Sequence, residues 1–263
     1  SQYMLAGDTV RALQIYDEVR QKEPTNTNLQ LATLDYLRDS RQDGRYNAMR
    51  DSLLFLADSP TQLRVLMLRS YIADVQSDST YAPRLEAAFD TLLARPQQDA
   101  QVLIMKAAYQ VYRKQSQEAI CETMRKVLEV EPCNETALRE LLQYYAEKND
   151  EKAVEDISRR GLNYHPEEIA YAYYLGMALA EQKKYTDATD VLQQGLRVRT
   201  EFVSPRLVSN VFGVLGDIYY QQQKETEAFA AYDSALVYMG DNIMCLNNYA
   251  YYLSLKGEQL DHL

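Results

Sequence analysis

The sequence predicts an all-α protein, built as a solenoid of antiparallel helix pairs. First, Ala, Leu, Glu, Gln, Arg and Tyr dominate the 263 residues, and no segment shows the alternation of β-branched residues typical of a strand. Second, residues 211–236 have the pattern of two amphipathic helices joined by the polar run Gln221 to Glu227. Third, this unit recurs along the chain. One helix pair cannot bury its apolar face alone, so copies of it must stack on either side. At this repeat length the chain holds about seven to eight pairs.

The helix pair at residues 211–236 shows the pattern most clearly. Gly216 and Ala228 are expected where the two helices cross too closely for a larger side chain, while aromatic residues fill the wider gaps. The residues that define the pattern recur at helical offsets of three and four, and they are Phe212, Leu215, Gly216, Tyr219, Ala228, Tyr232 and Ala235.

These seven residues match the tetratricopeptide-repeat (TPR) signature at its fixed spacing, so the chain resembles a TPR protein of the bacterial type. The resemblance implies a right-handed superhelix whose first helices line a concave surface that takes up peptides or partner helices. One known function of the family is disfavoured. The Lys, Asn and Arg pattern with which some members clamp a chaperone's terminal carboxylate is absent, and Asn248 is an isolated match.

Prolines recur along the chain about once per repeat. Successive members of the series Pro24, Pro60, Pro96, Pro132 and Pro166 are separated by 36, 36, 36 and 34 residues, and each follows the expected end of a second helix. We therefore expect a single TPR solenoid over residues 1–263 that is cut within a repeat at both ends, as in a fragment of a longer protein. The approximate repeats are 1–24, 28–60, 62–96, 101–132, 135–166, 169–200, 209–241 and 243–263.

The pairs at 28–60 and 62–96 depart most from the signature, because they lack its glycine and have longer turns. The pair at 28–60 is expected to turn at residues 42–46. The segment 200–206 is surplus between two repeats. One interpretation makes this surplus a recognition loop, because long loops between repeats lie at the edges of a solenoid. The interpretation that we favour is a longer second helix followed by a tilted helix pair.

Charge and hydropathy exclude several classes of partner. The net charge of −10 argues against nucleic acid, because phosphate binding needs clustered Lys and Arg. No run of apolar residues is long enough to span a membrane.

The sequence from Ser1 shows no secretion signal. The overall pattern is similar to long TPR proteins of bacterial cell envelopes, so the envelope or periplasm is our expectation and the cytoplasm the alternative.

Residues that could carry chemistry are few. Cys121, Cys133 and Cys245 form no C-x-x-C pair, and we expect Cys121 and Cys245 to be small core residues. The two histidines, His165 and His262, stand outside any catalytic motif. The sequence therefore predicts no enzyme, no metal site and no cofactor.

The predicted function is a non-enzymatic protein–protein interaction scaffold that binds a peptide or partner segment in a concave, Tyr-rich groove. The chain has 22 tyrosines and no tryptophan, and Tyr combines a large contact area with a polar hydroxyl. The alternative is a structural or oligomerisation arm of a larger envelope protein, with homo-oligomers as one form. The TPR resemblance implies these inner-face residues: Met105, Tyr109, Tyr112, Arg113, Arg139, Gln143, Tyr173, Met177, Asn210, Asp217, Tyr220, Asn247 and Tyr251.

Overall fold

A computed structural model of the protein describes residues 26–56, 59–96, 100–198 and 203–256, together with residues 11, 14, 15 and 18. Across these residues the structure has α-helices, one 3-10 turn and no strand, which confirms the all-α prediction. Apart from four positions, the expected repeat 1–24 lies outside the described residues, and so does the end of the last repeat from residue 257 onwards, including His262.

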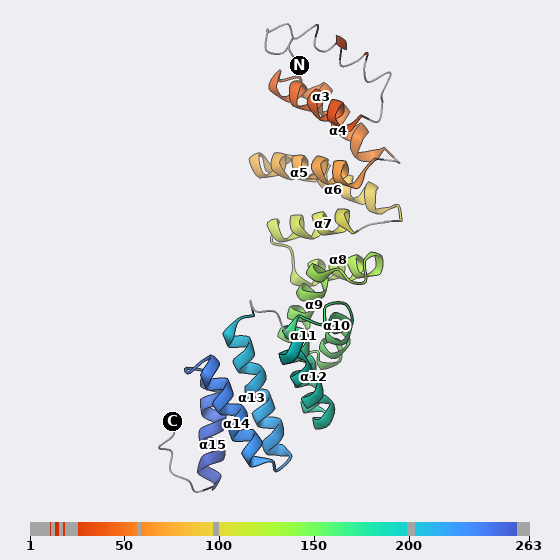
Figure 1. Ribbon diagram of the computed structural model, residues 1–263. Coiled ribbons are helices and arrows are strands. Elements are labelled where there is room, and N and C mark those ends of the chain that lie inside the picture. The colour runs from red at the N-terminus through yellow and green to blue at the C-terminus, as the bar shows by residue number, and fades with distance from the viewer. Residues whose placement is uncertain are drawn as a thin grey trace. The chain divides into compact units, whose positions relative to one another are not determined.

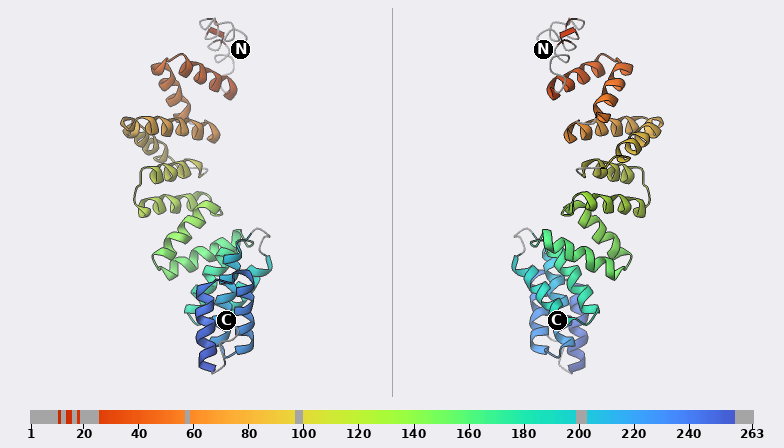
Figure 2. Two further views of the ribbon diagram at one scale, coloured as in Figure 1. Left: turned by 90° about the vertical axis from the view of Figure 1, so that its left-hand side faces the viewer. Right: turned by 90° about the vertical axis from the view of Figure 1, so that its right-hand side faces the viewer.

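The chain divides into two compact units, Ser1–Gln115 and Ser116–Leu263. The boundary falls inside the expected repeat 101–132, so the two helices of that repeat belong to different units. Within each unit, each helix packs on the next one along the chain (Figures 1 and 2).

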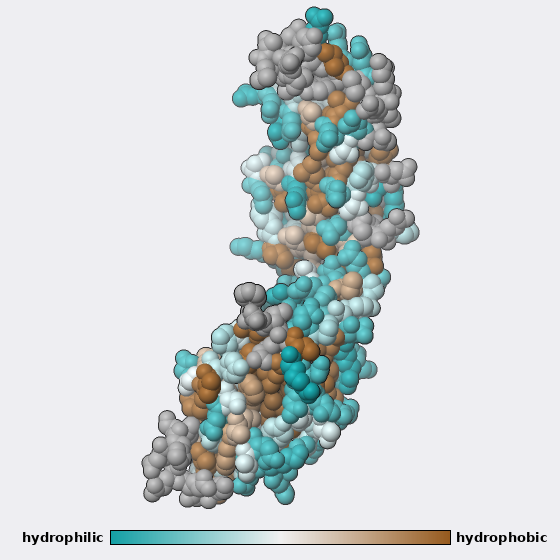
Figure 3. All heavy atoms as spheres, in the orientation of Figure 1, coloured by the Kyte–Doolittle hydropathy of each residue, from teal (hydrophilic) through white to brown (hydrophobic). Residues whose placement is uncertain are grey.

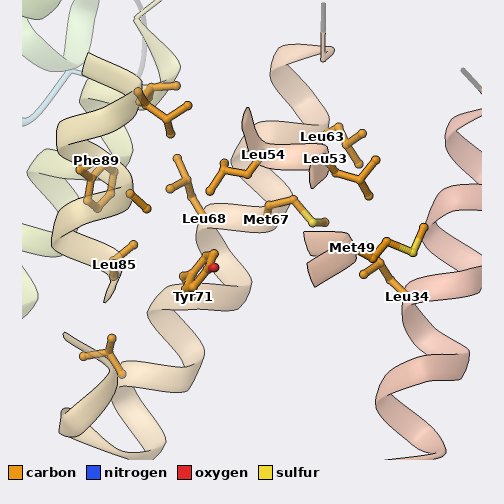
Figure 4. Packing of buried hydrophobic residues seen from close by; sticks show 14 of the residues in the cluster. Leu34, Met49, Leu53, Leu54, Leu63, Met67, Leu68, Tyr71, Leu85 and Phe89 are labelled. Atoms are coloured by element: carbon orange, nitrogen blue, oxygen red, sulfur yellow. The ribbon is translucent and has the colours of Figure 1, made fainter. Parts of the chain in front are cut away.

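The first unit contains α3 (Thr27–Asp39), α4 (Asp43–Phe55), α5 (Thr61–Ser77), the 3-10 turn η1 (Ser79–Tyr81), α6 (Ala82–Leu93) and α7 (Gln101–Tyr112). Its core forms where α5 packs on α4, α6 and α7. Figure 4 shows Leu68 and Tyr71 on α5 facing Leu85 and Phe89 on α6. These side chains are buried because each lies on the apolar face of its helix.

The second unit contains α8 (Gln117–Val130), α9 (Glu135–Glu147), α10 (Glu151–Tyr164), α11 (Ile169–Glu181), α12 (Tyr185–Val198), α13 (Pro205–Gln221), α14 (Glu225–Tyr238) and α15 (Ile243–Lys256). The side chains of Ser116, Asn134 and Asp150 cap α8, α9 and α10 by accepting a backbone N–H bond in the first turn. First helices also pack on the next first helix, α11 on α13 and α13 on α15. This stacking places the first helices of successive pairs beside one another.

The helix pair predicted at residues 211–236 is confirmed as α13 and α14. A Cβ atom added to Gly216 would lie 2.7 Å from the ring of Tyr232, which is fully buried. The glycine therefore lets α14 place an aromatic ring directly against the backbone of α13. Gly176 plays the same part on α11, where an added Cβ would lie 2.5 Å from Leu192 of α12.

Two turns differ from the expectation. The turn predicted at residues 42–46 is wrong, because α4 already begins at Asp43. Arg41 adopts a left-handed conformation with φ of 55° and closes the turn early. The surplus before α13 lengthens that first helix, which starts at Pro205 instead of residue 209; residues 199–202 lie outside the described residues.

Five helix pairs share one way of ending their first helix. Arg41, Lys114, Asn149, Lys183 and Gln223 all have positive φ, between 52° and 62°. At the last of these turns, the N–H of Lys224 bonds to the carbonyl of Tyr219 at 2.9 Å, and the other four turns repeat this bond. The pattern is that of a Schellman turn, whose left-handed residue is usually glycine.

Glycine at such a position should stabilise the protein. A non-glycine residue in the left-handed region is strained, and glycine relieves the strain at a smaller entropic cost, so Gln223→Gly should raise the free energy of unfolding by about 0.5 to 1 kcal/mol. Chemical denaturation followed by circular dichroism measures the change. Gln223→Val should act in the opposite direction, and two variants of equal stability would show that the turn is not strained.

Candidate functional site

Three hollows lie along the first helices of the second unit. The large hollow, of about 730 Å³, is lined by α9, the start of α11 and Leu207 of α13. The intermediate hollow, of about 220 Å³, is lined by α11 and by the end of α9 with the start of α10. The small hollow, of about 30 Å³, lies between α11, α13 and α15. Helices that stand first in their pairs supply most of the lining.

Six of the predicted inner-face residues line these hollows. Arg139 and Gln143 line the large hollow and Met177 the intermediate one. The small hollow is lined by Tyr173, Asn210 and Asp217. All six project from α9, α11 or α13.

The last described helix, α15, exposes an apolar face. Tyr251 is 59% exposed and Asn247 is also exposed, whereas Tyr220 of α13 is half-buried and its ring stacks on Tyr252 at 3.7 Å between centroids. Met244 and Leu255 are exposed on α15 as well, and the sequence analysis did not include them. Their offsets of seven and four from Tyr251 were the signal that would have placed them on the same helical face. On the face of the second unit seen in Figure 3, apolar side chains reach the surface among polar ones.

In the first unit the predicted residues divide into buried and exposed ones. The expectation that Tyr109 lies on an accessible surface is wrong: it is 2% exposed and packs on Phe89 of α6, with ring centroids 5.9 Å apart. Burial raises the pKa of its hydroxyl. Met105 is half-buried against the same core, while Tyr112 and Arg113 are exposed. A tyrosine at an inner-face position becomes core where the neighbouring helix covers it.

A further hollow, of about 590 Å³, lies between α3, α4 and α5 of the first unit, and the sequence analysis missed it. Its polar wall includes Tyr46, Asn47, Ser70 and Asp74. Behind this wall lies Arg50, which is fully buried. Its guanidinium donates to Asp74 at 2.6 Å, to Asn47 at 2.7 Å and to Ser70 at 3.0 Å. An arginine in the middle of an amphipathic helix is usually solvated, so the sequence gave little sign of this arrangement.

Asp217 stands at the centre of a polar cluster between α13, α14 and α15. Its carboxylate accepts a hydrogen bond from the hydroxyl of Tyr232 and bonds from Nδ2 of Asn248 at 3.0 and 3.1 Å. Burial raises the pKa of the Asp217 carboxyl, and the hydrogen bonds from Tyr232 and Asn248 offset part of that rise. Nearby, Asn242 donates to Asn210 at 2.9 Å. These bonds hold the floor of the small hollow in one arrangement.

The raised pKa of Asp217 gives a pH-dependent contribution to stability. The folded protein holds this proton more tightly than the unfolded chain, so the contribution is fully present below about pH 4 and falls as the pH rises through the folded pKa. Relative to the Asp217→Asn variant, the wild type should therefore lose stability as the pH rises above about 4. Urea denaturation of both proteins across this range measures the difference; a constant difference would contradict a raised pKa.

The cysteines lie where the sequence placed them. Cys121 and Cys245 are buried, which confirms their assignment to the core, and burial raises the pKa of each thiol to about 11. Cys133 is exposed, and its carbonyl oxygen lies 2.7 Å from Nε2 of His165. Among the described residues, no group of His, Cys, Asp and Glu is arranged to hold a metal ion. Nor does any helix in that part of the chain have the length and hydropathy to cross a membrane.

Comparison with solved structures supports the fold. The crystal structure of YrrB, described as a TPR protein with an unusual peptide-binding site, is 17% identical, covers 68% of this chain and 89% of its own, and has a TM-score of 0.50. Two structures of MamA have TM-scores of 0.48 and 0.49, at 17% and 12% identity; they cover 57% and 68% of this chain and 84% and 93% of their own. No protein-family model matches the sequence. No curated protein matches it either.

Proposed function

Because the chain has the helix-pair fold of TPR proteins, we propose that it is a non-enzymatic scaffold that binds a segment of another protein along the first helices of its second unit. The observation that carries the proposal is the placement of the six predicted residues around three hollows on α9, α11, α13 and α15. On α15, Met244 lines the small hollow, and Tyr251 and Leu255 are exposed farther along the same helix.

The chemistry of this surface suits a peptide. Its hollows combine aromatic and apolar side chains with a few polar groups, which is the composition of recognition surfaces in general. Exposed Tyr and Met side chains supply contact area, and Asn210 and Asp217 supply fixed polar groups. The similarity of the fold to YrrB, a protein with a peptide-binding site, agrees with this use. On the first unit, considered by itself, we propose the exposed residues Tyr112 and Arg113 as contacts for a partner.

To test the proposal, peptides are first selected from a random display library for binding to the whole chain. The affinity of the selected peptides is then measured for the wild type and for variants. Met177→Ala combined with Tyr251→Ala should weaken binding of the selected peptides about tenfold or more, because truncation of buried contact residues commonly costs more than 1 kcal/mol. Tyr164→Ala is the matched control, since Tyr164 is exposed on α10 and lines none of the three hollows. If the control weakens binding equally, or neither variant does, the groove is not the binding site.

A second candidate, the oligomerisation arm, is favoured by the apolar side chains at one end of α14 and α15. Val237 is 84% and Ile243 70% exposed. Such exposed apolar residues occur at protein interfaces. If this surface joins copies of the chain, sedimentation should show an oligomer that Val237→Asp with Ile243→Asp dissociates, and the peptide affinity of the monomeric variant should not change. A wild-type monomer at all concentrations excludes this candidate.

A further inference from the structure

The hollows of the second unit are lined by an excess of carboxylates. Glu147 and Glu168 line the large hollow, Glu151 and Glu181 the intermediate one, and Asp217 the small one. Arg139 is the one cationic residue that lines any of the three, and its guanidinium already lies 3.4 Å from Glu135. In the part of the chain that the structure describes, no Lys or Arg forms an ion pair with Glu168, Glu151 or Glu181. The surface therefore has negative charge that the protein itself does not neutralise.

An independent feature of the large hollow points to a ligand. Tyr171 of α11 lines this hollow and is 1% exposed, yet its buried hydroxyl has no hydrogen-bond partner among the described residues. Burial, together with the carboxylates of Glu135 and Glu168, raises the pKa of this hydroxyl to about 12, so it stays protonated at neutral pH. A buried hydroxyl without a partner is costly, and a bound polar group that pairs with it removes that cost.

The large hollow also offers an aromatic ring that suits a cation. Tyr174, which is only half-buried, lines it alongside Glu147 and Glu168. A Lys or Arg side chain is attracted by carboxylates and by the faces of aromatic rings, and its aliphatic stem packs on apolar side chains such as Leu142 and Leu207. An acidic side chain would meet repulsion from the same carboxylates.

We propose that the partner is a basic protein segment, and that one of its Lys or Arg side chains enters the large hollow between Glu147, Glu168 and the ring of Tyr174, while a polar group of the segment pairs with the hydroxyl of Tyr171. This inference rests on the proposed function, because it names the chemistry of the segment that the groove binds. Apolar residues of the segment lie toward α15, where Met244, Tyr251 and Leu255 are exposed.

Three pools of synthetic peptides test the inference on the whole chain. The pools share the same apolar positions, and the remaining positions carry Lys and Arg, Glu and Asp, or Gln and Ser. The basic pool should bind most tightly, and its affinity should fall with added salt. Glu147→Gln with Glu168→Gln should weaken binding of the basic pool about tenfold and that of the neutral pool much less, because charge-assisted hydrogen bonds are lost only for the basic pool.

The matched control removes the same charge elsewhere. Glu129→Gln with Glu140→Gln changes two exposed carboxylates on α8 and α9 that line none of the hollows, so it should not alter the affinity of the basic pool. Tyr171→Phe should weaken binding of the basic pool without lowering the melting temperature, because the lost hydroxyl has no partner in the protein alone.

The outcomes separate the inference from the proposed function. If the neutral or acidic pool binds as tightly as the basic pool, or the control variant weakens binding as much as the groove variant, the groove binds peptides but the inference about charge is wrong. If no pool binds, both are wrong. A melting temperature that falls in Tyr171→Phe would show that the hydroxyl has a structural partner, and it would overturn the proposed pairing of this hydroxyl with the segment.

Discussion

Arg50→Ala should lower the free energy of unfolding of the first unit by about 3 to 5 kcal/mol. Arg50 is fully buried and donates three hydrogen bonds. Its guanidinium carbon also lies over the ring of Tyr71, 3.6 Å from the ring centroid. Truncation removes these contacts and leaves Asp74 without its cation in a site that is only about a third exposed. Urea denaturation followed by circular dichroism measures the loss.

Arg38→Ala is the control for this prediction. Arg38 pairs with Asp35 at 3.0 Å, but both side chains are 61% exposed, so its loss should cost less than about 1 kcal/mol. Similar losses in the two variants would show that the surroundings of Arg50 are as hydrated as those of Arg38. In that case the wall of the first-unit hollow would not be held by Arg50.

Gly216→Leu should destabilise the second unit by about 1 to 3 kcal/mol. The new side chain begins where the ring of Tyr232 already lies, and Tyr232 cannot move without breaking its hydrogen bond to Asp217. The rings stacked on Tyr232, including that of Tyr249 at 5.3 Å, would shift with it. Thermal and urea denaturation should both record the change.

Gly240→Leu provides the comparison within the same unit. A Cβ at Gly240 meets only the carbonyl oxygen of Leu236, at an ordinary distance of 3.7 Å. Its stability should therefore stay within about 0.5 kcal/mol of the wild type. If Gly216→Leu unfolds like the wild type, α13 and α14 cross elsewhere than at Gly216, and the assignment of inner-face residues that follows from this crossing fails with it.

Small residues and spacing made the fold predictable. Gly216, Ala228 and the aromatic residues at fixed offsets specify how two helices cross, because only a narrow range of side-chain volumes fits at each position.

Turns were less predictable. The turn before α4 lies earlier than residues 42–46, because Arg41 adopts the left-handed conformation and Gly44 lies inside the helix. Backbone hydrogen bonds decide this, and the identity of the residue carries little signal.

The candidate site was predictable where a residue's face on its own helix decides its exposure. Arg139, Gln143 and Met177 lie on α9 and α11 and line hollows. Tyr109 occupies an equivalent position, yet α6 covers it, and periodicity along one helix does not reveal what a neighbouring helix covers. Similarly, Arg50 carries a charge and would be expected at the surface, but it is buried because Asn47 on α4 and Asp74 on α5 accept its hydrogen bonds. No pattern within one helix indicates these partners.

The five left-handed turns offer positions for chemical labels. Each turn is closed by bonds between backbone atoms, and the side chains of Arg41, Lys114, Asn149, Lys183 and Gln223 are exposed. A probe attached at Lys183 or Gln223 would therefore sit at a fixed place beside α11 or α13 without replacing any residue that lines the three hollows. Fluorescence between such probes could then report whether a bound segment changes the spacing of adjacent helix pairs.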